Sequence, residues 1–189
     1  MNSASVSGLY SRLAAAVAYV AVALLCIAAG ALAEVFFSQR EALEVAFPET
    51  DKIERRSFVL TKAQVDAIQE LARAPINSRI VTLHIGWRED RVIGYGVIDV
   101  HTVRTLPEAL MVVLTPEGAV RSVRVLAFHE PKEYLPTERW FKQFQGHKLE
   151  PSLQLKRGID AVTGATLSAR ATTRSVRRAL ALYQVLVKE

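Results

Sequence analysis

Residues 80–103 read IVTLHIGWREDRVIGYGVIDVHTV, and this stretch decides the fold. Ile80 to Trp87 and Arg91 to Val103 carry many β-branched residues and alternate between apolar and polar positions, a pattern that is typical of strands. Glu89 and Asp90 lie between the two segments. We therefore predict two antiparallel strands joined by a tight turn.

Two more strands are predicted directly downstream. Ala109 to Leu114 and Val120 to Phe128 are again rich in residues that favour strands. They flank Thr115-Pro116-Glu117-Gly118, which has proline and glycine where a β-turn favours them. The middle of the chain is thus expected to form an antiparallel meander.

Helical patterns flank this meander. Thr61 and Gln64 have the spacing of a capping box, which predicts a helix through Ala74. Pro136 to Phe144 indicates a short helix, and Ser168 to Val187 a long one with an apolar stripe. The expected fold class is α+β, with one antiparallel sheet flanked by helices.

The N-terminal segment predicts a membrane anchor. Leu13 to Ala33 contains no charge and no proline, and at ~1.5 Å per residue it is long enough to span the ~30 Å hydrocarbon core. Ala31-Leu32-Ala33 also resembles a signal-peptidase site, so a cleaved signal is the alternative. We favour the anchor because the apolar run is longer than signal sequences need.

The predicted anchor sets an expected topology and domain division. Arg12 before the span favours a cytoplasmic N-terminus in the inner membrane, with the remaining chain on the periplasmic or extracytoplasmic side. We expect an anchor over residues 1–37, a linker over 38–60 and one domain over 61–189. Phe37 to Phe58 has no steady period, which favours a linker.

Composition excludes several functional classes. The chain has 24 basic and 19 acidic residues, a net charge of +5, which favours anionic lipid or an acidic protein partner over nucleic acid. Cys26 is the single cysteine, so no intrachain disulfide or cysteine-ligated iron–sulfur cluster forms. The four histidines are scattered, and we expect no metal site. No hydrolase, Walker or dinucleotide motif is present, and we expect no catalytic residue.

The segment Asp160-Ala161-Val162-Thr163-Gly164-Ala165-Thr166-Leu167-Ser168 precedes the long C-terminal helix. A glycine-containing turn that leads into a helix brings unpaired N–H groups and the positive end of the helix dipole together. A phosphate binds well at such a place. The alternative is a plain helix cap without a ligand.

The order Asp160-x-x-Thr163-Gly164-Ala165-Thr166 resembles the attachment motif of the FMN-binding domain family. In that family the last threonine is esterified to the phosphate of FMN. The resemblance implies that Thr166 carries covalent FMN and that its motif neighbours surround the cofactor. Those neighbours are Asp160, Thr163, Gly164, Ala165, Leu167 and Ser168.

The resemblance extends over Ile80 to Leu186. Gly94-Tyr95-Gly96, the Pro116-Glu117-Gly118 turn, His129-Glu130 and Phe144-x-Gly146 follow the order usual in FMN-binding domains. Rnf-type subunits tend to have a glycine loop after the glutamate, whereas this chain has Glu130-Pro131-Lys132-Glu133-Tyr134-Leu135-Pro136.

Further residues are candidates for cofactor contacts. Tyr134 could stack on the flavin ring, and Glu130 or His129 could bond to a ring edge. Tyr134 and Leu135 could instead pack against the following helix. Arg170, one turn beyond Thr166, could pair with the flavin phosphate. The alternative is that Arg170, Arg174, Arg177 and Arg178 form a solvated charged face.

The resemblance implies an electron carrier rather than an enzyme that acts alone. Similar domains are the small flavin subunits of Rnf-type and sodium-pumping NADH:quinone reductase complexes, and the exported flavin domain of nitrous-oxide-reduction regulators. The implied partners are integral-membrane redox subunits, a flavin transferase that supplies FMN, and the lipid bilayer around residues 13–33. The alternatives are a flavin-dependent sensory or regulatory domain and an anchored scaffold without a ligand.

Overall fold

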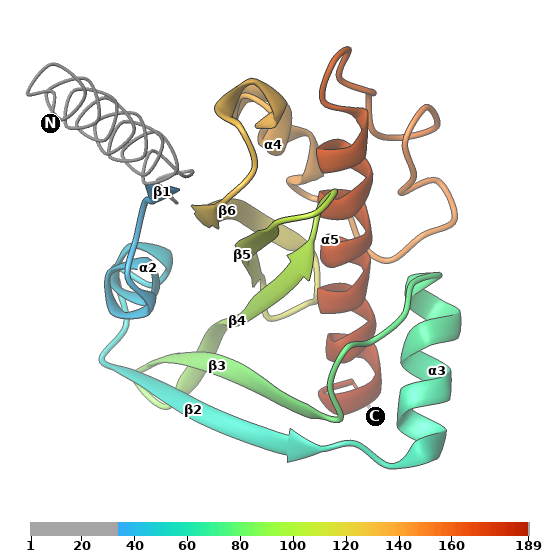
Figure 1. Cartoon of the computed structure of the whole chain (residues 1–189). Coiled ribbons are helices and arrows are strands. Elements are labelled where there is room, and N and C mark those ends of the chain that lie inside the picture. Colours follow the sequence, from blue (N-terminus) through green and yellow to red (C-terminus); the bar gives the residue numbers. More distant parts are fainter. Residues whose placement is uncertain (1–33, 189) are drawn as a thin grey trace, which may run out of the picture. The chain divides into compact units, whose positions relative to one another are not determined.

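The computed structural model describes residues 34–188 (Figure 1). In this part of the chain an antiparallel sheet is covered by helices, which confirms the predicted α+β class. The elements are, in order, β1 (Glu34–Val35), α2 (Gln39–Ala46), β2 (Lys52–Val59), α3 (Lys62–Ala72), β3 (Ile80–Arg88), β4 (Arg91–Thr102), β5 (Pro107–Leu114), β6 (Val120–Phe128), the 3-10 helix η1 (Lys132–Tyr134), α4 (Glu138–Phe141), the 3-10 helix η2 (Lys142–Phe144) and α5 (Thr166–Leu186).

The sheet has the strand order β1-β6-β5-β4-β3-β2, and every neighbouring pair is antiparallel. One row across it runs through Leu83, Val97, Val112 and Val123 of β3 to β6. The four predicted strands and their order are therefore confirmed. The turn at Glu89 and Asp90 is confirmed as well, since both residues have positive φ (46° and 61°), as a type I′ hairpin requires.

Both faces of the sheet are covered, and β5 shows this best. Leu110, Val112 and Leu114 belong to the larger core, which is shared with α3, α4 and α5. The alternate residues Met111 and Val113 belong to a smaller cluster under α2. Figure 1 shows α2 on one side of the sheet and α5 and α3 on the other. All five side chains are at most 1% exposed, so β5 is the buried centre of the domain.

Residues 38–60 were expected to form a linker, but in the structure they contain the helix α2 and the strand β2. Ser38 begins α2 with a capping box to Glu41, and β2 pairs with β3 along its full length. Phe47, which follows α2, packs over a glycine row of the sheet, where a Cβ at Gly86 would lie 2.6 Å from its ring. The sequence lacks a steady period here because β2 is an edge strand whose side chains are largely exposed.

The helices begin and end close to their predicted limits. Thr61 and Gln64 form the predicted capping box of α3. The predicted helix over residues 136–144 is divided into α4 and η2, and α5 begins at Thr166 rather than Ser168. No helix within residues 34–188 is long and apolar enough to cross a bilayer. The predicted membrane span, Leu13 to Ala33, lies outside the described residues.

Candidate functional site

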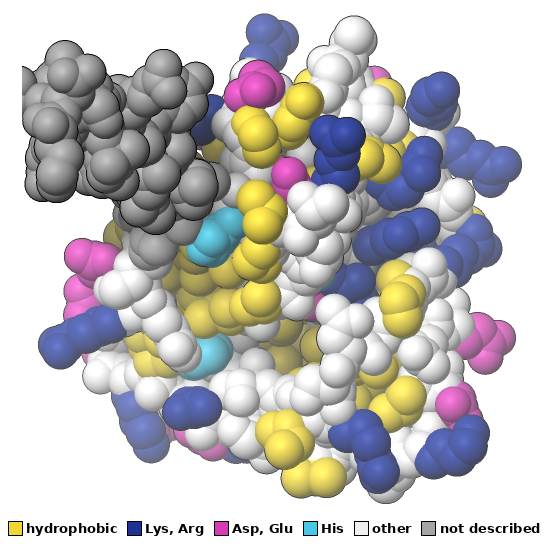
Figure 2. Space-filling model, viewed as in Figure 1, with side chains coloured by type: hydrophobic (Ala, Val, Ile, Leu, Met, Phe, Trp, Pro, Cys, Tyr) yellow, Lys and Arg dark blue, Asp and Glu magenta, His cyan; other side chains and the backbone are white. Residues whose placement is uncertain are grey.

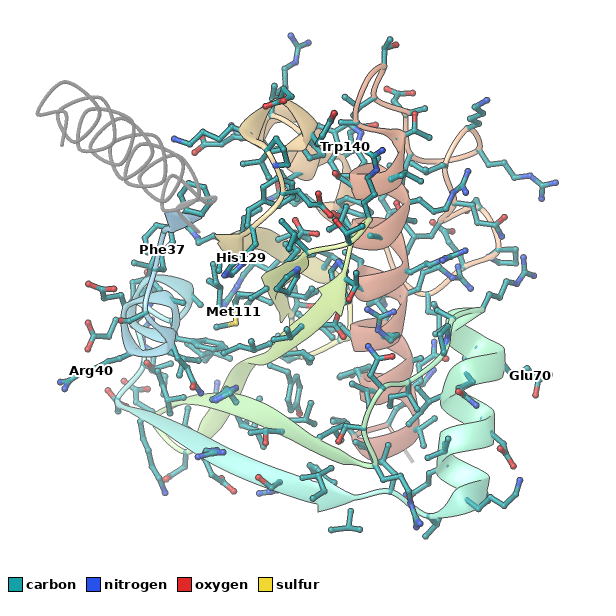
Figure 3. The ribbon with its side chains drawn as sticks, viewed as in Figure 1. Phe37, Arg40, Glu70, Met111, His129 and Trp140 are labelled. Carbon is teal, nitrogen blue, oxygen red and sulfur yellow. The ribbon has the colours of Figure 1, made fainter. Side chains whose placement is uncertain are left out.

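The turn that leads into α5 is held by the α4 region. The backbone N–H of Asp160 donates to Oε1 of Gln143 at 2.9 Å, and its carbonyl oxygen accepts from Nε1 of Trp140 at 2.7 Å. Trp140 lies beside the N-terminal end of α5 (Figure 3). Gly164 then adopts a φ of 82°, which a residue without a Cβ reaches easily. The turn thus directs the chain into Thr166, the first residue of α5.

Thr166 presents its hydroxyl at a positively polarised helix end. The residue is exposed, and its Oγ1 donates to the carbonyl oxygen of Val162 at 3.2 Å, which is long for such a bond. Within residues 34–188, no acceptor is bonded to the backbone N–H groups of Thr166, Leu167 or Ser168. These free donors and the helix dipole favour an anion beside the hydroxyl.

A cavity of about 180 Å³, which we call the Tyr134 pocket, opens beside Thr166. Ser168 is one of its lining residues, and the hydroxyl of Ser168 is buried and has no partner in the described part of the chain. A buried hydroxyl without a partner costs free energy, so a polar ligand atom in the pocket would be stabilised there. The pocket is lined by Val103, Arg104, Glu130, Tyr134, Gly164, Ala165, Thr166, Leu167 and Ser168.

Glu130 builds one wall of the Tyr134 pocket. Its Oε1 accepts from the backbone N–H groups of Arg104 (3.1 Å), Thr105 (2.7 Å) and Leu106 (2.8 Å). These bonds, chiefly the one from Thr105, lower the pKa of the Glu130 carboxyl because they stabilise its charged form. Glu130 therefore holds the β4–β5 loop in place as a carboxylate.

Tyr134 lines the same pocket from η1. The guanidinium carbon of Arg104 lies 5.9 Å from the centre of the Tyr134 ring, within the range of a cation–π contact. Arg104 and Tyr134 thus contact each other in the lining of the pocket. Leu135 does not line this pocket and packs against the main core.

A second cavity, which we call the basic hollow, opens on another side of Thr166 and has a volume of about 390 Å³. It lies between the C-terminal end of α3, residues 154–161 and α5. Thr166 and Arg170 both line it, so the predicted neighbours are close together in space. Its lining residues are Ala72, Arg73, Gln154, Leu155, Lys156, Ala161, Thr166, Arg170, Thr173, Arg174 and Arg177.

Four predicted site residues line neither cavity: Asp160, Thr163, His129 and Leu135. Asp160 and Thr163 are exposed, and the structure shows only backbone bonds for Asp160. His129 lies at the end of β6 (Figure 3), where its Nδ1 is 3.1 Å from the carbonyl oxygen of Pro107. Within residues 34–188, no group of three or more His, Cys, Asp or Glu side chains is arranged to hold a metal ion.

The predicted arginine face of α5 needs a correction. Arg170 and Arg174 are exposed, but Arg177 and Arg178 are only 5% and 6% exposed. Arg177 donates to the carbonyl oxygens of Leu71 and Ala72 at the end of α3. Arg178 pairs with Asp99 of β4. A long side chain whose guanidinium is fully bonded can be buried, so the solvated-face interpretation holds for only half of this set.

Sequence reasoning missed Val103 and Arg104. Both belong to the β4–β5 loop, whose conformation depends on the carboxylate of Glu130, which is distant in sequence. No local pattern marks this loop as part of a site. The three N–H bonds to Glu130 become visible only in the folded structure.

A comparison with protein families covers the segment that contains this site. Residues 107–181 match the family model described as the FMN-binding domain. This segment is an FMN-binding domain. The match runs from the start of β5 into α5 and includes Glu130, Tyr134 and Thr166. A search of curated proteins gave no match.

The residues of this FMN-binding domain suit the cofactor. The free N–H groups at Thr166 to Ser168 favour a phosphate, and the unpartnered Ser168 hydroxyl calls for a polar ligand atom. The Tyr134 pocket, at about 180 Å³, is smaller than the ~300–1,000 Å³ of pockets that enclose a whole ligand. It can therefore take only part of an FMN molecule, and the remainder would stay open to solvent or to a partner.

Proposed function

We propose that this chain is a membrane-anchored, exported electron-transfer flavoprotein that carries FMN in a phosphoester bond to Thr166. It acts as a subunit of a larger membrane redox complex rather than as an enzyme by itself. The observation that carries the proposal is the position of Thr166. An exposed hydroxyl lies at the positive end of α5, between the Tyr134 pocket and the basic hollow.

The described residues have distinct parts in this proposal. The free first-turn N–H groups of α5 stabilise the phosphate charge. Ser168 offers a hydrogen bond inside the Tyr134 pocket, and Tyr134 with Arg104 provides a flat, cationic edge beside it. Bound FMN supplies a group that accepts and donates one or two electrons. A pocket that covers only part of the cofactor leaves an edge accessible to a redox partner.

The membrane part of the proposal rests on the sequence. The apolar segment Leu13 to Ala33 would anchor the chain in the inner membrane, with the N-terminus in the cytoplasm and the domain on the periplasmic or extracytoplasmic side. A flavin transferase would supply FMN there, and integral-membrane redox subunits would be the neighbours. Protease added to intact spheroplasts should then digest the domain, and a protected domain would contradict this topology.

The attachment is tested with two matched threonine variants. Thr166→Val removes the hydroxyl at the start of α5, whereas Thr163→Val removes one that is also exposed and lies in the same turn. Both are expressed with a flavin transferase, denatured, and examined by intact mass and in-gel flavin fluorescence. We expect wild type and Thr163→Val to carry the mass of one FMN and Thr166→Val to lack it. Flavin retained on denatured Thr166→Val would contradict the proposed attachment site.

A further inference from the structure

Helix α5 carries an unbalanced positive charge. Its segment Thr166–Leu186 contains four arginines and no Asp or Glu. Arg170 and Arg174 are exposed and one turn apart, a spacing at which like charges repel. An anion bound between them would remove this repulsion.

The basic hollow concentrates the same charge. Arg73, Lys156, Arg170, Arg174 and Arg177 line it, and no Asp or Glu does. Figure 2 shows Lys and Arg side chains gathered where α5 faces the loop that precedes it, above α3. A concave site lined by charges of one sign focuses the electric field, and its affinity for an oppositely charged ligand rises.

Four of these five cations have no ion pair within residues 34–188: Arg73, Lys156, Arg170 and Arg174. Other arginines in the described part of the chain, such as Arg55 and Arg139, also have no ion pair, but the hollow gathers four unpaired cations around one cavity. Their combined charge is available to a ligand from outside the chain.

Among the five cations that line the hollow, Arg177 is the one that holds the surrounding backbone in place. Its guanidinium donates to the carbonyl oxygens of Leu71, Ala72, Glu150 and Leu153 and therefore fixes the floor of the hollow. Burial, and next the charge of Arg73, lower the pKa of Arg177, so the two guanidinium groups are close enough to repel each other.

The flavin phosphate does not balance this charge. A phosphoester between FMN and Thr166 is a diester with a single negative charge, which leaves most of the four unpaired cations without a partner. The shape of the hollow favours a small soluble anion over an anionic membrane surface. A flat membrane surface cannot enter a hollow, whereas about 390 Å³ falls within the ~300–1,000 Å³ that small-molecule sites occupy.

We propose that the basic hollow is a second ligand site, separate from the flavin attachment, which binds a small soluble molecule that carries a di- or polyphosphate group. Arg170 and Arg174 would bind its phosphates from α5, and Arg73 and Lys156 from the opposite wall. The apolar side chains of Ala72, Leu155 and Ala161 would contact its organic part. This site does not depend on covalent attachment at Thr166.

The test uses the full-length chain in detergent, with inorganic pyrophosphate as the probe and isothermal titration calorimetry as the measurement. Binding is measured at low and high salt for the flavin-loaded wild type and for Thr166→Val, which is expected to lack the flavin. The double variant Arg170→Gln/Arg174→Gln removes two exposed charges from the hollow. The control Arg55→Gln/Arg139→Gln removes two exposed charges that do not line it.

We expect pyrophosphate to bind loaded and flavin-free protein alike and to weaken with salt. The hollow variant should bind about tenfold more weakly or worse, since it loses charge-assisted bonds to phosphate, while the control keeps its affinity. Equal weakening in the control, no binding, or binding only to flavin-free protein would overturn the proposal. So would Arg170- and Arg174-dependent binding to phosphatidic acid vesicles without pyrophosphate binding. The Thr166→Val mass measurement decides the proposed function separately.

Discussion

The guanidinium of Arg178 and the carboxylate of Asp99 form an ion pair between α5 and β4, with Nε and Oδ1 3.0 Å apart. The other carboxylate oxygen of Asp99 is 2.8 Å from Nδ1 of His101, and Nε2 of His101 is 3.0 Å from Oε2 of Glu108. These four side chains form one polar network on the sheet face that α5 covers, in which Asp99 is partly exposed and the other three are buried. The network fixes how α5, and hence Thr166 at its start, lies against the sheet.

Arg178→Met should destabilise the domain strongly. The substitution leaves the largely buried carboxylate of Asp99 with His101 as its remaining partner. Losing one partner of a buried pair costs about 3–5 kcal/mol. Urea denaturation would measure the loss of unfolding free energy. The double variant Asp99→Asn/Arg178→Met should lose less than the sum of the two single variants, because neither partner is left charged and alone. Additive losses would show that the pair is not coupled.

The His101 network should make the domain less stable as the pH rises above neutral. Burial lowers the pKa of His101, but the hydrogen bonds that its ring donates to the carboxylates of Asp99 and Glu108 outweigh burial and raise the pKa above its usual value. Because the pKa of His101 is higher in the folded state, its protonation stabilises the fold fully at pH values below the pKa of an unfolded histidine, ~6.5. This stabilisation is lost as the pH rises through the folded-state pKa. Burial also raises the pKa of Glu108, so its contribution to stability likewise falls with rising pH, beginning at the acidic pKa of an unfolded carboxyl.

The measurement for this pH dependence is the unfolding free energy of wild type and His101→Gln between pH 6 and pH 9. Wild type should lose stability with rising pH, and His101→Gln should have a flatter profile because it cannot release that proton. A wild-type stability that stays constant or rises over this interval would contradict the assigned direction.

The sequence predicted the parts of the fold that local pattern controls. The strands β3 to β6 and the capping box at Thr61 follow from residue type and spacing over short windows. The helix α2 and the strand β2 were predicted to be part of a linker. Their patterns are weak because an edge strand and a short surface helix have few apolar positions. Arg177 and Arg178 were assigned to the surface since their partners, Ala72 and Asp99, are distant in sequence.

In the candidate site, too, local sequence predicts some features, whereas others depend on contacts between distant segments. The position of Thr166 at the start of a helix, after a glycine turn, could be inferred from the motif itself. The basic hollow could not, because it needs the end of α3 and residues 154–161 to meet α5. Arg104 reaches the Tyr134 pocket only through the bonds that Glu130 makes to its loop.

Gly118→Ala should cost about 3 kcal/mol of stability. A Cβ at this position would lie 2.1 Å from Cε1 of Tyr183, and the residue has a φ of 73°. Overpacking costs about 1–3 kcal/mol and a left-handed residue about 1–2 kcal/mol. Gly146→Ala is the control, because Gly146 has a φ of 82° and open space around its Cα. Equal losses of unfolding free energy in the two variants would show that the contact with Tyr183 is not tight.

Gly164→Ala separates the stability of the turn from its role at Thr166. Gly164 and Gly146 both have a φ of 82°, and an added Cβ would meet nothing within 4 Å at either position. Each substitution should therefore cost about 1–2 kcal/mol from the left-handed backbone alone. Only Gly164 lies in the turn that presents the Thr166 hydroxyl, so only Gly164→Ala should reduce covalent FMN loading, measured by intact mass at matched expression. Gly164→Asn should recover part of the loading, since Asn tolerates positive φ better than Ala does. An equal fall in loading for Gly146→Ala would indicate that reduced stability, rather than the shape of the turn, limits attachment.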